Sequence, residues 1–111
     1  MANFLANPWA GEVALVIGGE RRVLKLTLGA LAELEAALKT ETLVALVERF
    51  EGGGFSSRDV LLLLAAGLRG GGWQGQTEEL AQADIEGGPM VAARVAAELL
   101  ARAFTVPGET A

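Results

Sequence analysis

Two patterns of apolar residues divide this chain into a short β region and a longer helical region. From Glu12 to Leu26 the larger aliphatic residues alternate with other residues on both sides of Gly18-Gly19, which is typical of a β-hairpin. If Gly19 and Glu20 are the central residues of a type II′ turn, the turn sets the register. The predicted cross-strand pairs are then Ile17 with Arg22, Leu15 with Leu24, and Val13 with Leu26. An isolated hairpin is marginal in water, so its aliphatic face requires a cover.

The rest of the chain shows the spacing of amphipathic helices. Five helices are predicted, and their expected capping or first residues are Thr27, Thr40 or Thr42, Ser56 or Ser57, Thr77, and Gly88-Pro89. Glycines at 52–54, 70–72 and 87 are expected to end the second, third and fourth helices. The segment VLLLLAAGL in the third helix is apolar on all sides, which predicts a central position. The fold class is therefore α+β, an N-terminal β-hairpin packed on a bundle of four to five α-helices.

Buried and charged faces can be assigned on three of these helices. The first helix is expected to bury Leu28, Leu31, Leu34 and Leu38, and the second Leu43, Leu46, Val47 and Phe50. In the first helix Glu35 lies four residues before Lys39, a spacing that favours an ion pair. The last helix, from Met90 to about Phe104, carries a charged stripe of Arg94, Glu98 and Arg102 at the same spacing.

The length of 111 residues suits one domain spanning residues 1–111, with an ordered core at about 8–104 and flexible ends. The longest apolar run, Val60 to Leu68, has nine residues, whereas a bilayer span needs roughly 20. The N-terminus lacks the basic and apolar regions of a secretory signal. We therefore expect no membrane partner and a cytoplasmic location.

Charge and composition exclude several function classes. The chain has 14 acidic and 9 basic residues, a net charge of −5, which disfavours nucleic acid as a partner. It contains no cysteine and no histidine, so thiol catalysis, structural zinc sites and Ser-His nucleophiles are excluded. No catalytic, cofactor-binding or metal-binding residue is predicted, and we expect a protein that is not an enzyme.

The glycine-rich stretches and acidic pairs fit structural roles better than chemical ones. None of the stretches at Gly18, Gly52 and Gly70 has the Lys and Ser/Thr of a P-loop or the spacing of a dinucleotide loop. Each follows a predicted strand or helix, where glycine allows the chain to reverse. The acidic pairs Glu33/Glu35 and Glu78/Glu79 are expected to be solvated, with the second pair favourable at a helix start.

Two tryptophans and the last helix are the candidate partner-binding features. Trp9 and Trp73 each lie in a loop with glycine or proline, where the ring either covers the small core or docks on another protein. The apolar residues of the last helix are ambiguous in the same way, because they fit a core helix or a face kept for a second chain. The partner-binding candidates are Trp9, Trp73, Val91, Val95 and Leu99.

Three stretches resemble the gene transfer agent family of small tail proteins, which are encoded among the tail genes of alphaproteobacterial gene transfer agents and related prophages. They are Asn7-Pro8-Trp9 before a Gly-Glu-Val strand, Leu26-Thr27-Leu28-Gly29 at the start of a Leu-rich helix, and Phe55-Ser56-Ser57-Arg58-Asp59-Val60 at another helix start. The similarity covers roughly residues 7–104. These residues maintain a fold, so the resemblance specifies a family more firmly than a mechanism.

The resemblance implies a part in building a phage-like tail, as either a tail assembly chaperone or a tail tube protein. A tube subunit generally has a β-rich body whose strands close around a channel, and only one hairpin is readable here. The preferred interpretation is therefore a chaperone that covers apolar helical segments of the tape-measure protein while the tail tube protein polymerises. The alternative is a structural tail component retained in the particle, and the same apolar faces would also serve a homo-oligomer. A small-molecule binding domain or enzyme is the least favoured reading.

Overall fold

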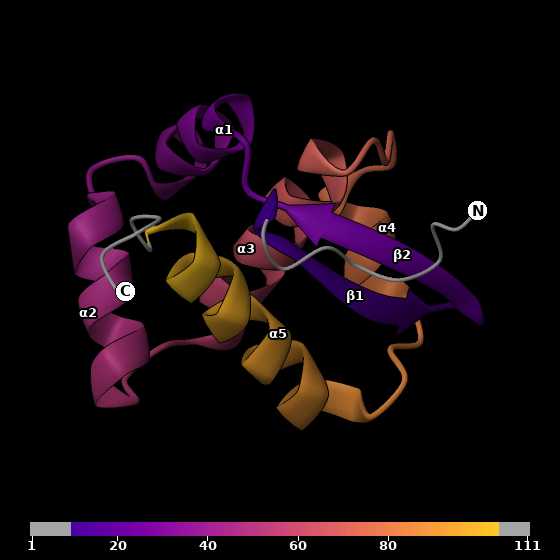
Figure 1. Cartoon of the computed structure of the whole chain (residues 1–111). Coiled ribbons are helices and arrows are strands. Elements are labelled where there is room, and N and C mark those ends of the chain that lie inside the picture. Colours follow the sequence, from indigo (N-terminus) through magenta and orange to yellow (C-terminus); the bar gives the residue numbers. More distant parts are fainter. Residues whose placement is uncertain (1–9, 105–111) are drawn as a thin grey trace, which may run out of the picture.

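The computed structural model describes residues 10–104 as an antiparallel hairpin followed by helices, which confirms the predicted α+β class (Figure 1). The elements are β1 (Glu12–Ile17), β2 (Glu20–Lys25), α1 (Leu28–Leu38), α2 (Leu43–Gly52), α3 (Ser57–Gly70), α4 (Thr77–Gln82) and α5 (Gly88–Ala103). The predictions made for Trp9 and for both ends of the chain lie outside the described residues.

The hairpin register differs from the predicted one because the turn is formed by both glycines. Gly18 and Gly19 have φ of 59° and 83°, and this left-handed pair makes a two-residue loop of the kind that twists with the strands. Ile17 therefore pairs with Glu20 and not with Arg22, so the predicted register is wrong by two residues. A shift by an even number leaves every side chain on its face. The core-facing residues were consequently assigned to the correct side.

A segment after α4 extends the hairpin on the outer side of β1. The Gly18 amide donates to the Asp84 carbonyl at 2.8 Å, and the Glu86 amide donates to the Val16 carbonyl at 3.0 Å. The predicted fourth helix, ending near Gly87, is therefore too long. It ends at Gln82, because the following residues pair with β1.

Polar side chains cap the first three helices as the sequence pattern predicted. The Thr27 and Thr42 hydroxyls accept from the amides of Ala30 and Ala45, each at 3.0 Å. Ser56 caps α3 reciprocally with Asp59, since the Ser56 hydroxyl accepts from the Asp59 amide and the Asp59 carboxylate accepts from the Ser56 amide. Each cap satisfies backbone donors that the helix leaves unpaired.

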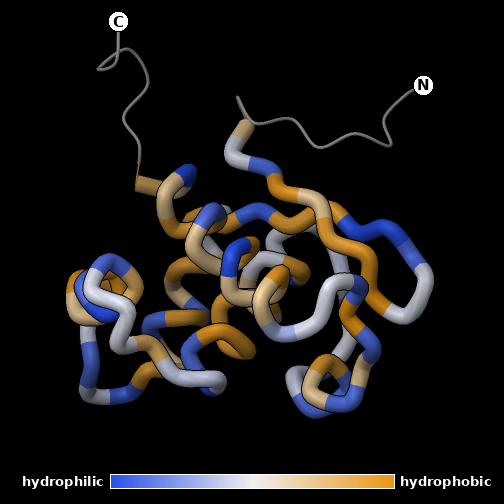
Figure 2. The backbone as a smooth tube through the Cα atoms, turned by 90° about the horizontal axis from the view of Figure 1, so that it is seen from below, coloured by the Kyte–Doolittle hydropathy of each residue, from blue (hydrophilic) through white to orange (hydrophobic). Residues whose placement is uncertain are grey.

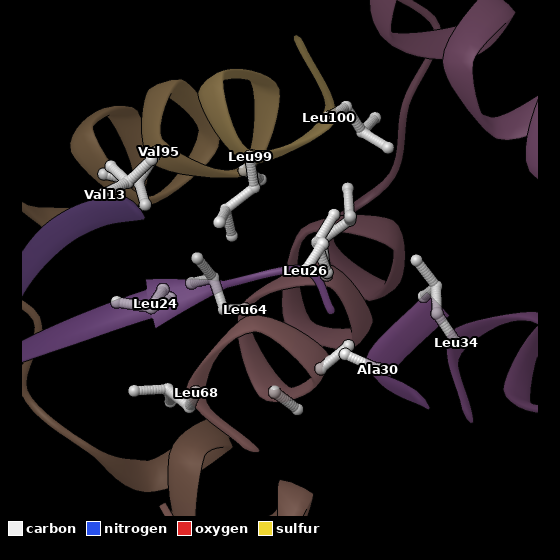
Figure 3. Packing of buried hydrophobic residues seen from close by; sticks show 14 of the residues in the cluster. Val13, Leu24, Leu26, Ala30, Leu34, Leu64, Leu68, Val95, Leu99 and Leu100 are labelled. Atoms are coloured by element: carbon white, nitrogen blue, oxygen red, sulfur yellow. The ribbon is translucent and has the colours of Figure 1, made fainter. Parts of the chain in front are cut away.

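The core is built around α3, as predicted for an apolar helix. Leu64 of α3, Leu24 of β2 and Leu99 of α5 point into the same space, with Val13 and Val95 beside them (Figure 3). Hydrophobic stretches cross the middle of the molecule and hydrophilic ones lie mainly at its periphery (Figure 2). The side chains buried most completely are Leu24, Leu34, Leu46, Leu63, Leu64, Leu68 and Leu99.

The end of α3 lies directly on the backbone of β2. A Cβ on Gly70 would overlap the carbonyl oxygen of Lys25, and one on Gly71 would overlap that of Val23. Only residues without a side chain allow this approach. These two glycines therefore position the central helix against the hairpin, which is a role beyond ending the helix.

Some predicted faces and pairs are not present. Leu28, assigned to the buried stripe of α1, is 83% exposed because it occupies the first turn, where the helix has not yet reached the core. Glu35 and Lys39 form no ion pair, since Lys39 leaves the helical path with φ of 62°. Arg94, Glu98 and Arg102, the charged stripe of α5, form no ion pair with one another or with another residue of the range 10–104.

Candidate protein-contact surfaces

The described residues offer surfaces for contact and few groups for chemistry. Among residues 10–104 there is no group of three or more acidic, histidine or cysteine side chains able to hold a metal ion. No helix in that range has the length and apolar character to cross a membrane. The candidate contact surfaces are therefore formed by partly exposed apolar and charged side chains.

Trp73 is held in place by the end of α3. Its amide donates to the Leu68 carbonyl at 2.9 Å, and the guanidinium carbon of Arg69 lies 5.9 Å from the ring centroid. Arg69 is itself fixed by Thr77 at 3.1 Å and Glu33 at 3.3 Å. The ring is half-buried against the core and stays partly open to solvent. The ring therefore covers part of the core and keeps one accessible part, and its docking on another protein stays a prediction.

A shallow groove lies beside the Trp73 ring. Apolar side chains form most of its walls, and Arg22 and Glu79 are the charged residues that line it. Its volume of about 200 Å³ has room for one or two side chains and not for a large cofactor. The complete lining is Ile17, Arg22, Leu68, Trp73, Glu79, Leu80 and Ala83.

The candidates on α5 lie mainly inside the molecule. Val95 and Leu99 are 2% and 1% exposed and belong to the core, whereas Val91 is half-buried. Of the predicted partner-binding residues in the described range, Trp73 and Val91 thus present accessible surface. Whether any of them binds a partner stays a prediction. Periodicity could not separate the α5 face that packs on the hairpin from one that faces solvent, because the helix is apolar on several sides.

The large apolar side chains that are most exposed were not among the predicted contacts. They are Leu28, Val44, Met90 and Phe104. Met90 lies in the first turn of α5 and Phe104 directly follows its end. Their positions at or near helix termini are the signal from which they could have been recognised.

An ion-pair network joins α2 to the start of α3. Arg49 Nε and Nη2 donate to the two carboxylate oxygens of Asp59, each at 2.9 Å, and Arg49 Nη2 lies 3.1 Å from Glu41 Oε1. Asp59 is the one buried charged residue of the described chain, 6% exposed. Burial favours a raised pKa for Asp59, but hydrogen bonds from Arg49 and Ser56 outweigh it and hold the pKa below its ordinary value. The hydrogen bond to Asp59 raises the pKa of Arg49.

The same network forms one wall of an open groove of about 470 Å³. The turn between α1 and α2 and the start of α3 form the other walls, and Lys39 and Arg58 contribute two further cations. The sequence indicated the Ser56 and Asp59 cap, but not the partner Arg49, which comes from another helix. The lining is Ala37, Leu38, Lys39, Glu41, Arg49, Gly54, Ser56, Arg58, Asp59 and Leu62.

The chain matches one known protein family over most of its length. The family model described as "Phage tail tube protein, GTA-gp10" matches residues 10–106. The chain belongs to this family. The resemblance to gene transfer agent tail proteins is thereby confirmed, and the protein has a role related to phage tails. No curated protein and no solved structure shows significant similarity to the chain.

Proposed function

We propose that this protein is a structural subunit of a phage-like tail, of the tube type, which is retained in the finished particle. The observation that carries the proposal is the family match over residues 10–106, whose description names a phage tail tube protein. This description favours the alternative raised from the sequence over the chaperone that the sequence pattern alone preferred. We further propose that the protein acts without catalysis, since the chain has neither histidine nor cysteine.

A retained subunit needs surfaces that stay in contact with neighbouring subunits. Trp73, in a groove that fits one or two side chains, is the contact residue we favour, together with the accessible part of Val91. The exposed Leu28 and Met90 provide further apolar surface. The partners would be other tail proteins, and assembly would take place in the cytoplasm.

A second candidate is the tail assembly chaperone, and one observation favours it. The sheet of the described residues has two strands, whereas a wall built by closing strands around a channel requires more. As a chaperone, the protein would bind the tape-measure protein and be absent from the finished tail. A tube-type subunit with this fold would instead build its contacts largely from helices.

Quantitative mass spectrometry of purified particles separates the two candidates. Particles are isolated from a producing strain, and the copy number of this chain is measured against the tape-measure protein. The structural proposal expects many copies of this chain for each tape-measure protein. Abundant chain in the lysate with only traces in intact particles would refute it and support the chaperone. An unrelated cytoplasmic protein of similar abundance, measured in both fractions, controls for carry-over.

A further inference from the structure

The groove formed by the α1–α2 turn and the start of α3 is lined by two cations that form no ion pair among residues 10–104. Arg49 is neutralised there by Asp59 and Glu41. Lys39 and Arg58 line the same groove, are exposed, and take part in no ion pair within the described range. Glu48 and Glu51 of α2 do not line it. In a chain with a net charge of −5, one groove is thus lined by two cations that form no ion pair within residues 10–104.

Both cations occupy positions that are unfavourable for folding. Lys39 has φ of 62° and is the one non-glycine residue with positive φ in the part described by the structure. Such a conformation is strained for a residue with a side chain, and glycine would adopt it with less strain. Arg58 lies in the first turn of α3, where the helix dipole disfavours positive charge. The stability of the monomer therefore does not account for a cation at either position.

Unpaired acidic groups lie on the opposite side of the molecule. Glu78, in the first turn of α4, and Asp84, directly after that helix, are exposed. Neither side chain takes part in an ion pair within residues 10–104. Figure 1 shows α2 at the left edge of the molecule and α4 on the other side of α3, behind the hairpin. The basic groove and this acidic site are thus far apart on one molecule and complementary in charge.

We propose that the basic groove receives the acidic α4 site of a second copy of this chain, so that copies join head to tail. Lys39 and Arg58 of one copy would contact Glu78 and Asp84 of the next. A contact between two different surfaces of the same chain generates a ring or an open filament, whereas a self-complementary contact stops at a dimer. The inference rests on the proposed structural role and names the contact through which subunits would repeat.

Charge exchange between the two sites tests the contact. Lys39→Glu with Arg58→Glu is expected to weaken self-association of the full chain about tenfold or more, because attraction becomes repulsion. Glu78→Lys with Asp84→Lys is expected to do the same. Mixing the two double variants pairs the reversed groove with the reversed α4 site and should restore association between unlike copies. Sedimentation velocity at low and high salt provides the readout, and the wild type should dissociate as salt rises.

Arg94→Glu is the matched control, since Arg94 is an exposed arginine on α5 that does not line the groove. It should associate like the wild type, and circular dichroism verifies that every variant is folded. The proposal is overturned if the Lys39 and Arg58 variant associates like the wild type, if Arg94→Glu weakens association equally, or if the mixture shows no recovery. A wild type that stays monomeric at the highest attainable concentration also refutes it.

The self-association experiment and the mass spectrometry of particles can fail independently of each other. Recovery of the chain in particles, with assembly unaffected by the charge reversals, would sustain the structural role and reject this contact. Charge-dependent self-association of a chain that is absent from particles would sustain the contact and reject the structural role.

Discussion

Gly52–Gly54 and Gly70–Gly72 are the same three residues in the same local context, each beginning with the last residue of a helix. Their surroundings differ. A Cβ added at any of the first three would meet no atom within 4 Å. In the second set, a Cβ added at Gly70 or Gly71 would overlap a carbonyl oxygen of β2. One cluster reverses the chain at the edge of the molecule, and the other brings the central helix against the hairpin.

Two helix ends that share the same three glycines are thus held by different forces. Close packing against rigid backbone holds the end of α3. The corresponding end of α2 lacks such packing, and its last turn is connected to α3 by Arg49 and Asp59 instead. Phe50 and Phe55, whose ring centroids are 4.5 Å apart, add an apolar contact across the same junction. Substitutions at the two ends should therefore have different costs.

Gly70→Ala should have the largest effect. Its methyl group would overlap the Lys25 carbonyl oxygen, and backbone cannot move aside as a flexible side chain can. We expect the free energy of unfolding to fall by about 3 kcal/mol, at the upper end of the overpacking range. Gly52→Ala, the matched change at the last residue of α2, should be neutral or slightly stabilising. Urea denaturation of both variants measures the difference, and equal midpoints would show that the close approach is not maintained in solution.

Arg49→Ala should have the next largest effect. It leaves the buried Asp59 carboxylate without its two side-chain donors while the Ser56 amide remains, and we expect a loss of about 2 kcal/mol. Arg94→Ala, which removes an exposed arginine from α5, should change stability by less than about 0.5 kcal/mol. Native-state hydrogen exchange should place the increased opening of Arg49→Ala in α2. Uniform loss across α3 and the hairpin would contradict this division.

The features that could be predicted from the sequence are those set by residues close together along the chain. Alternation, helical spacing and caps identified the hairpin and the helices, because Thr27, Thr42 and Ser56 act on amides within three residues of themselves. The contacts of Gly70, Gly71 and Arg49 join separate elements of the fold, and no local pattern encodes them. The candidate site was harder to predict for the same reason. Val95 and Leu99 have the side chains of a contact face, and only the position of the hairpin makes them core.

The smallest expected effect is that low pH removes the stabilising contribution of Asp59 at the junction between α2 and α3. Asp59 has a pKa below its ordinary value in the folded protein, so its contribution to stability is present above the unfolded pKa of about 4. It is lost as pH falls through the folded pKa, because the unfolded state then binds the proton more readily. The stability difference between the wild type and Asp59→Asn should therefore be largest near neutral pH and shrink below about pH 4.

Other carboxylates titrate in both proteins and cancel in this difference. Gly70→Ala should remain a constant amount less stable than the wild type over the same pH range, since its cost is steric. Parallel pH profiles for all three proteins would show that Asp59 carries no favourable ion pair in solution, and α2 would then be held by its apolar contacts alone.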